Sequence, residues 1–600
     1  MLNRRTTLLG AVAVSASAAF AGRGMAQTPA GSGPSRFSAL NILYRTDPER
    51  IARVLPPPLE PDDDPIVQID FFVTTAPGGV VNVMAPEDYF ETAIQLAAKY
   101  KGNRGLYQLS LGLNGEWGRS SGREGPGWVK KEGLVRLDWQ DKAIDASYWR
   151  RGQHIVSLKA QATDQPAHPR LWMRDFGWGA FLFRHRLDPD WRNGLVDPEY
   201  GVELWRLGGN DEGFPTEAVA DEPGVPRALD PRSVELMFPD LSLSDAWGEF
   251  PVRDIIGGSF SGHVGERLKR PPRQGSSQQT VYGARAKFVE KVDVGAFEPH
   301  AFFSYDRPTI ANKPMLPPGW PATTTAWKLT AEEIQMYKAR TSVTLNANAI
   351  TLDGEISSDL HRQILPEGVE AGDEAIVRFL ALDVTSSDIS TVPFKELWLL
   401  ARCRNAGAAG WYALSHIVGP GGDVLLGRET FGYPSKVGSI TIATTPTGVE
   451  FSGDRLLREF VRASAEVGDA AALTTETAPV IGLAARFNRP DTDDVFRARF
   501  VVQPWSIEPA GDCRSLKNLA ITLSSTPAPG RIGLPDPWFE IQPTRIKGAW
   551  AGPVRISRMP ATKGGSVPDY RRFYMERMDG TQSAMAEPST STFRINLPPT

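Results

Sequence analysis

Short apolar runs that alternate with polar residues recur along most of the chain, and glycine and proline separate them. Alternation of this kind, bounded by turn-forming residues, is typical of β-strands with one buried face. The pattern therefore predicts strands joined by turns, with few long helices. The strands predicted in the first half are 40–44, 66–73, 107–118, 135–139 and 154–162.

Three short segments show helical spacing instead. Asp47 and Pro48 are a favourable N-cap and first helical residue, and apolar residues follow at helical spacing as far as Leu55. Residues 329–337 open the second half with a capping threonine and two acidic residues in the first turn. Residues 455–465 place several apolar side chains on one helical face, so this segment is also predicted to be a helix.

An internal repeat relates the two halves of the chain. The tripeptide Gly-Arg-Glu at 122–124 recurs at 427–429, and this offset of 305 residues holds without a gap from residue 91 to residue 131. Fixed spacing over this length indicates a tandem duplication of one domain, and the alternative is two unrelated domains that share a tripeptide. The repeated blocks are 53–70 with 363–380, 91–110 with 396–415, and 122–133 with 427–438.

Length and composition agree with two folded domains. The 600 residues are more than one hydrophobic core usually serves, and 49 prolines and 57 glycines favour strands and turns. A net charge of −4 gives no electrostatic basis for binding nucleic acid. We expect a first domain at 34–307, a proline-rich linker at 308–328 and a second domain at 329–590.

The first 26 residues differ in kind from the rest. Arg4 and Arg5 precede an apolar run and then small residues, which is the order found in export signals. The arginine pair resembles a twin-arginine signal, and the alternative is an N-terminal tail without a targeting function. No other stretch approaches the roughly 18 apolar residues that a membrane span needs. The sequence thus predicts an exported protein, periplasmic in a host with two membranes.

A search for catalytic or metal-binding patterns leaves one candidate. The seven histidines show no metal-ligand spacing, and the only cysteines, Cys403 and Cys513, do not make a metal site. Residues 257–262 are glycine-rich but lack serine where a nucleophile elbow requires it. Whether the two cysteines form a disulfide stays open. No metal or cofactor is expected, and the adjacent lysines Lys130 and Lys131 are what is left.

A lysine amine is a nucleophile only in its neutral form. Because the reference pKa of lysine is about 10.4, a catalytic lysine needs burial or a neighbouring cation to lower it. Adjacent residues of an extended chain point to opposite faces, so Lys130 and Lys131 are not expected to share one pocket. We therefore expect burial to lower the pKa of the catalytic lysine more strongly than the charge of the neighbouring lysine does. The two lysines are predicted to lie in the connection between two strands, and the alternative to a catalytic role is a solvated lysine pair there.

The repeated residues resemble the acetoacetate decarboxylase family. The resemblance rests on Gly-Arg-Glu five residues ahead of Lys130, on the Gly-Tyr-Pro at 432–434 and on the stretch 44–60. It implies an α+β fold of two tandem antiparallel β-barrel domains that form a pseudo-dimer. It also implies that Lys130 forms a Schiff base with a β-keto acid, and that the iminium accepts the electrons released as carbon dioxide leaves.

The same resemblance assigns further residues to the site. Lys131 is the second lysine of the catalytic pair, and Asp70 and Glu91 match the substrate-binding carboxylates, although the family usually has glutamate at the first of these. A carboxylate at such a position binds substrate or carries a proton. Trp128 and Val129 replace the Tyr-Pro that precedes the lysines in the family.

The second copy departs further from the family pattern. Ser435 occupies the position of the nucleophile, and only the second lysine is kept, as Lys436. Glu396 repeats the carboxylate of Glu91, whereas Leu380 replaces the other one. Because one residue along a strand exchanges faces, Lys436 is expected to point away from the second pocket. Lys436 and Glu396 are thus the candidate residues of a second, degenerate site.

Two functions fit these observations. The first is an exported lyase that decarboxylates a small keto acid, or carries out related aldol or dehydration chemistry, through a lysine Schiff base. The second is an exported binding protein that holds a small molecule without turnover. A small keto acid is the expected partner, nucleic acid and a membrane span are not expected, and an oligomer is left open.

Overall fold

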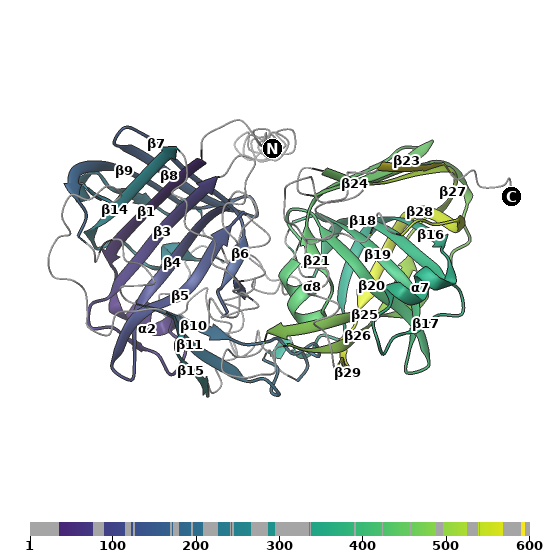
Figure 1. The fold of residues 1–600 in the computed structure, drawn as a ribbon, viewed down its shortest axis with the longest axis horizontal. Helices are drawn as coiled ribbons and strands as arrows, with labels where there is room; N and C mark the ends of the chain where they lie inside the picture. Colours follow the sequence, from purple (N-terminus) through teal and green to yellow (C-terminus); the bar gives the residue numbers. More distant parts are fainter. Residues whose placement is uncertain are drawn as a thin grey trace, which may run out of the picture.

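The computed structural model describes most of both halves of the chain, and Figure 1 shows them as two β-rich units, the first in purple to teal and the second in green to yellow. Over the residues that the structure describes, each unit forms one 15-stranded sheet. The described residues are 35–75, 89–114, 122–123, 127–168, 171, 179–193, 196–207, 226–240, 242, 245–265 and 286–294 in the first half, and 335–336, 338–388, 390, 392–422, 424–455, 458–487, 496–524, 538, 541–567 and 590–594 in the second.

The first sheet follows the order β15-β11-β10-β5-β4-β3-β1-β14-β12-β9-β8-β7, with β2, β6 and β13 paired at its sides. A short helix, α2 (Pro48–Val54), follows the first strand, and two 3₁₀ turns, η3 (Pro231–Ser233) and η4 (Trp247–Glu249), lie further along. The strands are β1 (Ser35–Arg45), β2 (Glu60–Pro61), β3 (Ile66–Thr75), β4 (Tyr89–Tyr100), β5 (Asn103–Leu113), β6 (Lys130–Glu132), β7 (Leu134–Gln140), β8 (Ala143–Arg150), β9 (Gln153–Pro166), β10 (Ala180–Arg184), β11 (Val202–Leu207), β12 (Arg227–Leu229), β13 (Glu235–Met237), β14 (Asp254–Gly265) and β15 (Ala286–Val292).

The second sheet repeats the central part of this order and closes on itself. Its helices are α7 (Ser358–Ile364) and α8 (Val424–Phe431). Its strands are β16 (Val343–Glu355), β17 (Glu370–Ala371), β18 (Ile376–Ser387), β19 (Phe394–Asn405), β20 (Ala408–Val418), β21 (Ser435–Val437), β22 (Ser439–Thr444), β23 (Gly448–Arg455), β24 (Arg458–Ala470), β25 (Glu476–Phe487), β26 (Phe496–Pro509), β27 (Arg514–Ser524), β28 (Arg545–Arg558), β29 (Thr562–Val567) and β30 (Thr590–Arg594). Because β26 pairs with both β25 and β28, seven strands close a barrel in the order β28-β16-β18-β19-β20-β25-β26.

The predicted fold class is confirmed in its main features. Two tandem β-rich units are present, and the pairing within each is mainly antiparallel. The parallel pairs are β5 with β6 and β10, and β20 with β21 and β25. They lie beside the candidate lysines, since β6 carries Lys130 and Lys131 and β21 carries Lys436. The short strand β6 also corrects one prediction, since Lys130 and Lys131 belong to a strand and not to a loop between strands.

Alternation along the strands separates an interior face from an outer face. On β3 the side chains of Val67, Ile69 and Phe71 join the interior core of the first unit. Gln68 and Asp70 alternate with them and are buried on the other face. Buried polar groups in folded proteins are held by specific partners, so the buried polar side chains on the outer face are expected to form defined contacts there.

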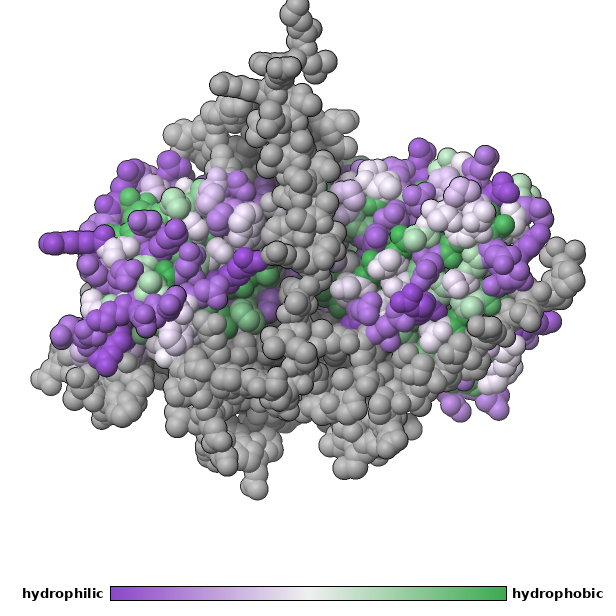
Figure 2. Space-filling view, turned by 90° about the horizontal axis from the view of Figure 1, so that it is seen from above, coloured by the Kyte–Doolittle hydropathy of each residue, from purple (hydrophilic) through white to green (hydrophobic). Residues whose placement is uncertain are grey.

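The described surface is mainly polar. Met237 and Met336 are the large hydrophobic residues that are exposed among the described residues. Seen from above, the described atoms are mostly purple and white with small green patches (Figure 2). None of the helices in the described part of the chain has the length and apolar character to span a bilayer.

The prediction of a helix at 455–465 is wrong. Most of this segment belongs to β24, which pairs with β23 and β27. Val461, Ala463 and Ala465 are buried, and the residues between them are exposed. Two-residue alternation therefore decides the structure, and the four clustered apolar residues at the start of the segment had imitated a helical face.

Several predicted features fall outside the described residues. They are the export signal at 1–26, the linker at 308–328 and most of the helix at 329–337. Strand β30 extends the second sheet to Arg594, a few residues past the predicted end of the second domain at residue 590.

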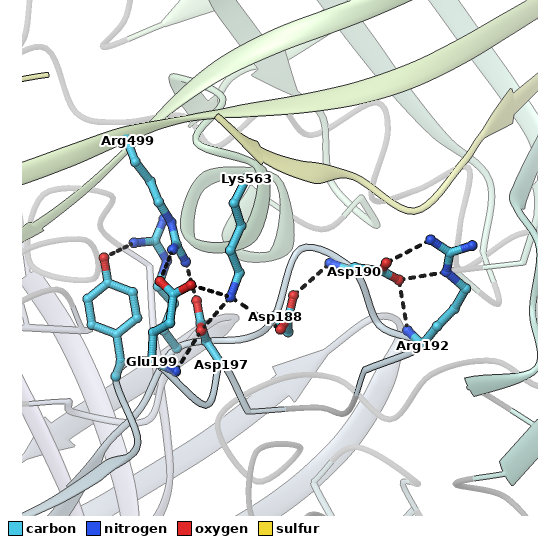
Figure 3. A network of polar contacts seen from close by, with 9 residues as sticks. Asp188, Asp190, Arg192, Asp197, Glu199, Arg499 and Lys563 are labelled. Carbon is cyan, nitrogen blue, oxygen red and sulfur yellow. Dashed lines mark hydrogen bonds and ion pairs between the residues drawn. The ribbon is translucent and has the colours of Figure 1, made fainter. Parts of the chain in front are cut away.

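A buried polar network joins the two units (Figure 3). Asp197 of the first unit is fully buried and receives hydrogen bonds from Arg499 on β26 and from Lys563 on β29, the latter at 2.7 Å. Glu199 lies beside it and accepts a hydrogen bond from Arg499 at 2.6 Å. On the same side, the indole of Trp191 donates to the carbonyl of Arg340 at 3.0 Å and packs into a core cluster of the second unit. Some of the side chains that join the two repeats, such as Asp197 and Trp191, are thus buried.

The two cysteines are free and buried, which answers the question that the sequence left open. Burial raises the pKa of the Cys403 thiol to about 12. We expect a water-soluble disulfide reagent to modify neither Cys403 nor Cys513 in the native protein and to modify both after unfolding in denaturant. Thiol counts in the two states test this, and a count of zero in denaturant would instead reveal a disulfide.

Candidate active site

The short strand β6 sets the two lysines on opposite sides of the sheet. Lys130 lies opposite Leu111 and Lys131 lies opposite Gly112 in the parallel pairing with β5. Leu111 belongs to an apolar cluster on the outer face, whereas a side chain at Gly112 would collide with Tyr148 of the interior core. The two amines therefore face different surroundings, as expected for successive residues of an extended chain.

Lys130 is buried on the outer face beside a tyrosine and a carboxylate. Its side chain is about nine-tenths buried, and its Nζ donates to the hydroxyl of Tyr89 at 2.8 Å and lies 3.3 Å from Oε2 of Glu91. The Tyr89 hydroxyl in turn donates to the carboxylate of Glu91. All three groups can exchange a proton, because each is within hydrogen-bonding reach of the next.

Gly122 and Arg123 of the repeated tripeptide hold Lys130 in place. A Cβ at Gly122 would come within 2.7 Å of Cε of Lys130, so a larger residue at this position would displace the end of the lysine side chain. Arg123 donates to the main-chain carbonyl of Lys130 at 3.1 Å. The same guanidinium pairs with Glu429 of the second unit, its Nη2 lying 3.0 Å from Oε2. The strand that carries Lys130 is therefore tied to the contact between the repeats.

Lys131 has a structural setting inside the first unit. Its Nζ lies 3.4 Å from Oδ1 of Asp245, which also accepts a hydrogen bond from Ser110 at 2.8 Å. The other oxygen of Asp245 pairs with Arg150 at 2.9 Å. The buried carboxylate of Asp245 thus pairs with two buried cations, so that neither cation is left without an opposite charge.

The two predicted carboxylates of the first site share one face of the sheet. Asp70 on β3 lies opposite Ala93 on β4, two residues from Glu91. Asp70 accepts a hydrogen bond from Gln95 at 2.6 Å, whereas Glu91 contacts Lys130. The structure therefore places Glu91 in contact with the amine of Lys130, whereas Asp70 lies near Glu91 on the same face and is bonded to Gln95.

The second unit holds a different group of side chains at the equivalent positions. At the offset of 305 residues Ser435 replaces Lys130, and His416 replaces Leu111. These two replacements face each other in the pairing of β20 with β21, and Oγ of Ser435 lies 2.7 Å from Nδ1 of His416. The sequence prediction missed His416, although its position opposite the nucleophile position follows from the repeat.

Glu396 is the centre of this second group. It accepts hydrogen bonds from Arg558 at 2.7 Å and from the indole of Trp398 at 2.8 Å, and its Oε1 lies 3.6 Å from Nε2 of His416. Burial alone would raise the pKa of this carboxyl, but the Arg558 guanidinium outweighs burial and holds the pKa well below its usual range. Glu396 is therefore ionised at neutral pH.

Burial also lowers the pKa of His416, and Arg558 lowers it further, while Glu396 opposes both. The imidazole is thus neutral at pH 7. Its ring stacks on Trp398 with the centroids 3.5 Å apart and the planes at 15°. A neutral, oriented imidazole beside a hydroxyl is the arrangement of a general base.

Lys436 lies on the other face of its strand. It is opposite Ile417 in the β20–β21 pairing, and Ile417 belongs to the interior core of the second unit. Lys436 is therefore the counterpart of Lys131 and not of Lys130. Arg558, which the sequence prediction also missed, reaches Glu396 from β28, far away along the chain.

No set of three histidine, cysteine, aspartate or glutamate side chains is arranged to hold a metal ion within the described ranges. The chemistry available from this chain's own residues is that of an amine, a tyrosine and a carboxylate in the first unit. In the second unit it is that of a hydroxyl, an imidazole and a carboxylate.

A family model described as acetoacetate decarboxylase (ADC) matches residues 17–199 and 324–489, more than half of the chain and both repeats. The chain belongs to the acetoacetate decarboxylase family. The two matched segments also support the duplication of a family domain within one chain.

Relatives in the acetoacetate decarboxylase family match parts of the chain. An acetoacetate decarboxylase of Streptomyces nogalater is 38% identical over 109 residues, which are 18% of this chain and 42% of that protein. One of Chromobacterium violaceum is 35% identical over 142 residues, which are 22% of this chain and 55% of that protein. The chain spans about half the length of these relatives.

Two solved structures match parts of the chain at low sequence identity. The crystal structure of acetoacetate decarboxylase from Legionella pneumophila matches at 16% identity and a TM-score of 0.31, covering 38% of this chain and 90% of that one. The enduracididine biosynthesis enzyme MppR, in complex with pyruvate, matches at 15% identity and a TM-score of 0.30, covering 37% of this chain and 90% of that one.

Proposed function

We propose that the first repeat is a lysine-dependent decarboxylase of a small β-keto acid. The observation that carries the proposal is the buried amine of Lys130, with the Tyr89 hydroxyl at 2.8 Å and the Glu91 carboxylate at 3.3 Å. The names of the curated relatives support the same reaction class. The N-terminal pattern of 1–26 supports export, so the reaction is proposed to occur outside the cytoplasm, in the periplasm of a host with two membranes.

The reaction follows from the chemistry of an imine. The neutral amine of Lys130 attacks the ketone carbon, water leaves, and a protonated imine forms. The bond to the carboxylate then breaks, carbon dioxide leaves, and the electron pair moves into the imine to give an enamine. Protonation at carbon and hydrolysis release the ketone and restore the lysine. In this proposal Glu91 and Tyr89 carry the protons of these steps.

Two influences act on the charge of Lys130. Burial favours the neutral amine, whereas the contact with Glu91 favours the ammonium. The hydrogen bond from Tyr89 to Glu91 draws carboxylate charge away from the lysine. The ion-pair distance of 3.3 Å favours the second candidate function, a binding protein in which a permanent ammonium holds a small acid without turnover.

Reductive trapping separates the two functions. The full-length protein is incubated with acetoacetate and borohydride, digested, and analysed by mass spectrometry. A lyase gives a reduced adduct on the peptide that contains Lys130, because borohydride converts the lysine imine into a stable secondary amine. If neither acetoacetate nor pyruvate yields an adduct while binding of acetoacetate is measurable, the binding function stands and the lyase is excluded.

The role of Tyr89 has its own test. We expect Tyr89→Phe to keep the trapped adduct on Lys130 but to lower turnover by about 10²-fold, because the imine can form while a proton carrier is lost. Release of carbon dioxide measures the turnover. The matched control is Tyr100→Phe at the other end of β4, which removes a hydroxyl that donates to Glu290 of β15 and should leave the rate unchanged. Equal turnover of Tyr89→Phe and wild type would remove Tyr89 from the mechanism.

We also propose that the two repeats associate as the two subunits of a dimer would. The pairing of Arg123 with Glu429 supports this, because each residue belongs to a copy of the same Gly-Arg-Glu tripeptide.

A further inference from the structure

The second site is rebuilt around new polar groups. A site that had only decayed would keep remnants of the first one or fill with apolar side chains. Here the lysine position has become Ser435 and the apolar position opposite has become His416, while the carboxylate is kept as Glu396. The two new residues are in contact with each other, so their changes are linked.

The three side chains form a continuous line. Oγ of Ser435 lies 2.7 Å from Nδ1 of His416, and Nε2 of the same ring lies 3.6 Å from Oε1 of Glu396. Their exposed fractions are 0%, 2% and 3%. With its proton on Nε2, the ring accepts from the serine and directs its own N–H at the carboxylate. Within the described part of the chain this nitrogen has no hydrogen-bond acceptor at bonding distance, and such contacts often shorten once substrate binds.

The surroundings fix the orientation of each member. Arg558 and the indole of Trp398 both bind Oε2 of Glu396, which leaves Oε1 to face the imidazole. The stacking of His416 on Trp398 sets the plane of the ring and stabilises the imidazolium that proton uptake would create. A nucleophile that is hydrogen-bonded to a base, with a carboxylate on the far side of that base, is recognised as a catalytic triad by these roles and not by sequence position.

We propose that Ser435, His416 and Glu396 form a second active centre that transfers acyl groups from small, activated carboxylic esters. Oγ of Ser435 attacks the ester carbonyl while its proton passes to Nδ1 of His416. The carbon–oxygen bond to the alcohol breaks, and the alcohol leaves with the proton from Nδ1. Water then attacks the acyl-serine, His416 again moves the proton, and the acid is released. Glu396 balances the positive charge of the ring in both halves of the cycle.

The substrate class follows from the walls of the site. Trp398, Tyr433 and Trp505 pack edge to face against one another beside the imidazole, and these aromatic neighbours favour a small acyl group that is apolar or aromatic. Arg558 lies over the rings of Trp398 and Trp505 and supplies a fixed positive charge toward which a developing oxyanion is attracted.

Helix α8 controls access to the serine. A Cβ at Gly427 of α8 would lie 2.7 Å from Oγ of Ser435, so this helix covers the nucleophile. An ester therefore reaches Ser435 when α8 moves outward, and reaction should be slower with bulky acyl groups than with acetyl.

Active-site labelling tests the proposal on the full-length protein. A fluorophosphonate probe is expected to modify the peptide that contains Ser435, and p-nitrophenyl acetate is expected to be hydrolysed. Ser435→Ala and His416→Gln should each lower the rate of hydrolysis by about 10³-fold, as loss of a triad member does. The matched control is Ser439→Ala, which changes an exposed serine of β22 next to the site and should leave labelling and hydrolysis unchanged.

A second variant keeps the test decisive if Ser435→Ala fails to fold. Ser435→Cys places a thiol beside His416, and we expect iodoacetamide to alkylate it in the native protein while Cys403 and Cys513 stay unmodified. Absence of fluorophosphonate labelling at Ser435 overturns the proposal, as does hydrolysis by Ser435→Ala at the wild-type rate, or a Ser435→Cys thiol as inert as the two buried ones. Trapping at Lys130 is measured separately, so the two centres fail or succeed independently.

Discussion

Replacing Lys130 by alanine is expected to abolish decarboxylation of acetoacetate, lowering kcat/KM by roughly 10³-fold or more, because the step that forms the imine has no other nucleophile at this position. The loss should appear in kcat, since the amine acts in bond breaking and not only in binding. Release of carbon dioxide and reductive trapping measure the two consequences separately, and the adduct should disappear together with turnover.

The matched control for this variant is Lys99→Ala. Lys99 lies at the far end of β4 and pairs with the exposed carboxylate of Asp63 at 2.7 Å. Its loss removes the same positive charge from the chain without touching the site, so activity should stay at the wild-type level. Retention of decarboxylation by Lys130→Ala, or transfer of the adduct to another lysine, would contradict the assignment of the nucleophile.

Replacing Asp197 by alanine is expected to destabilise the folded chain by about 3 to 5 kcal/mol, because it leaves two buried or partly buried cations without their common carboxylate. These are Arg499 and Lys563, which reach Asp197 from two strands of the other repeat. The variant should unfold at a clearly lower urea concentration. It should also be cut by protease more readily between the repeats, because this carboxylate joins them.

Glu199→Gln is the control within the same network. Glu199 contacts the same two cations, but its side chain is 63% exposed, so the change should cost no more than about 1 kcal/mol. If both variants unfolded at the same urea concentration, the buried carboxylate would have no special weight in holding the repeats together.

The pH dependence of the Asp197 effect has a definite sign. Burial would raise the pKa of Asp197, but Lys563 and Arg499 outweigh burial and hold the pKa below its usual value. A carboxyl whose pKa is lowered in the folded state stabilises the protein at neutral pH and loses this contribution as the pH falls through the lowered value. The difference between wild type and Asp197→Ala should therefore be largest near neutrality and shrink in strong acid.

The repeat made the first site accessible from sequence. The constant offset aligns the two copies, and alternation along a strand assigns Lys130 and Lys131 to opposite faces from the sequence alone. The structure brings Lys130 to Glu91 and separates Lys131 from both. Tyr89, two residues ahead of Glu91, lies on the same face of β4 by the same rule, so the sequence pattern also predicts its place beside Glu91.

The parts that could not be predicted depend on long-range pairing. Arg558 reaches Glu396 because β28 closes the second barrel, and no local pattern announces that closure. The helix prediction for 455–465 is wrong because four clustered apolar residues are compatible with a helix as well as with the start of a strand. Its identity as β24 is decided by its neighbours β23 and β27, which lie in separate parts of the sequence.

The ion pair between Arg123 and Glu429 has a consequence for how the two halves could diverge. In a homodimer every substitution occurs in both subunits, so a change that suits one centre is imposed on the other. Fusion of the copies into one polypeptide releases this constraint while the arginine that supports the Lys130 strand still finds its glutamate across the contact. One chain can then carry an amine at one centre and a hydroxyl at the other, always in equal numbers and always in the same compartment.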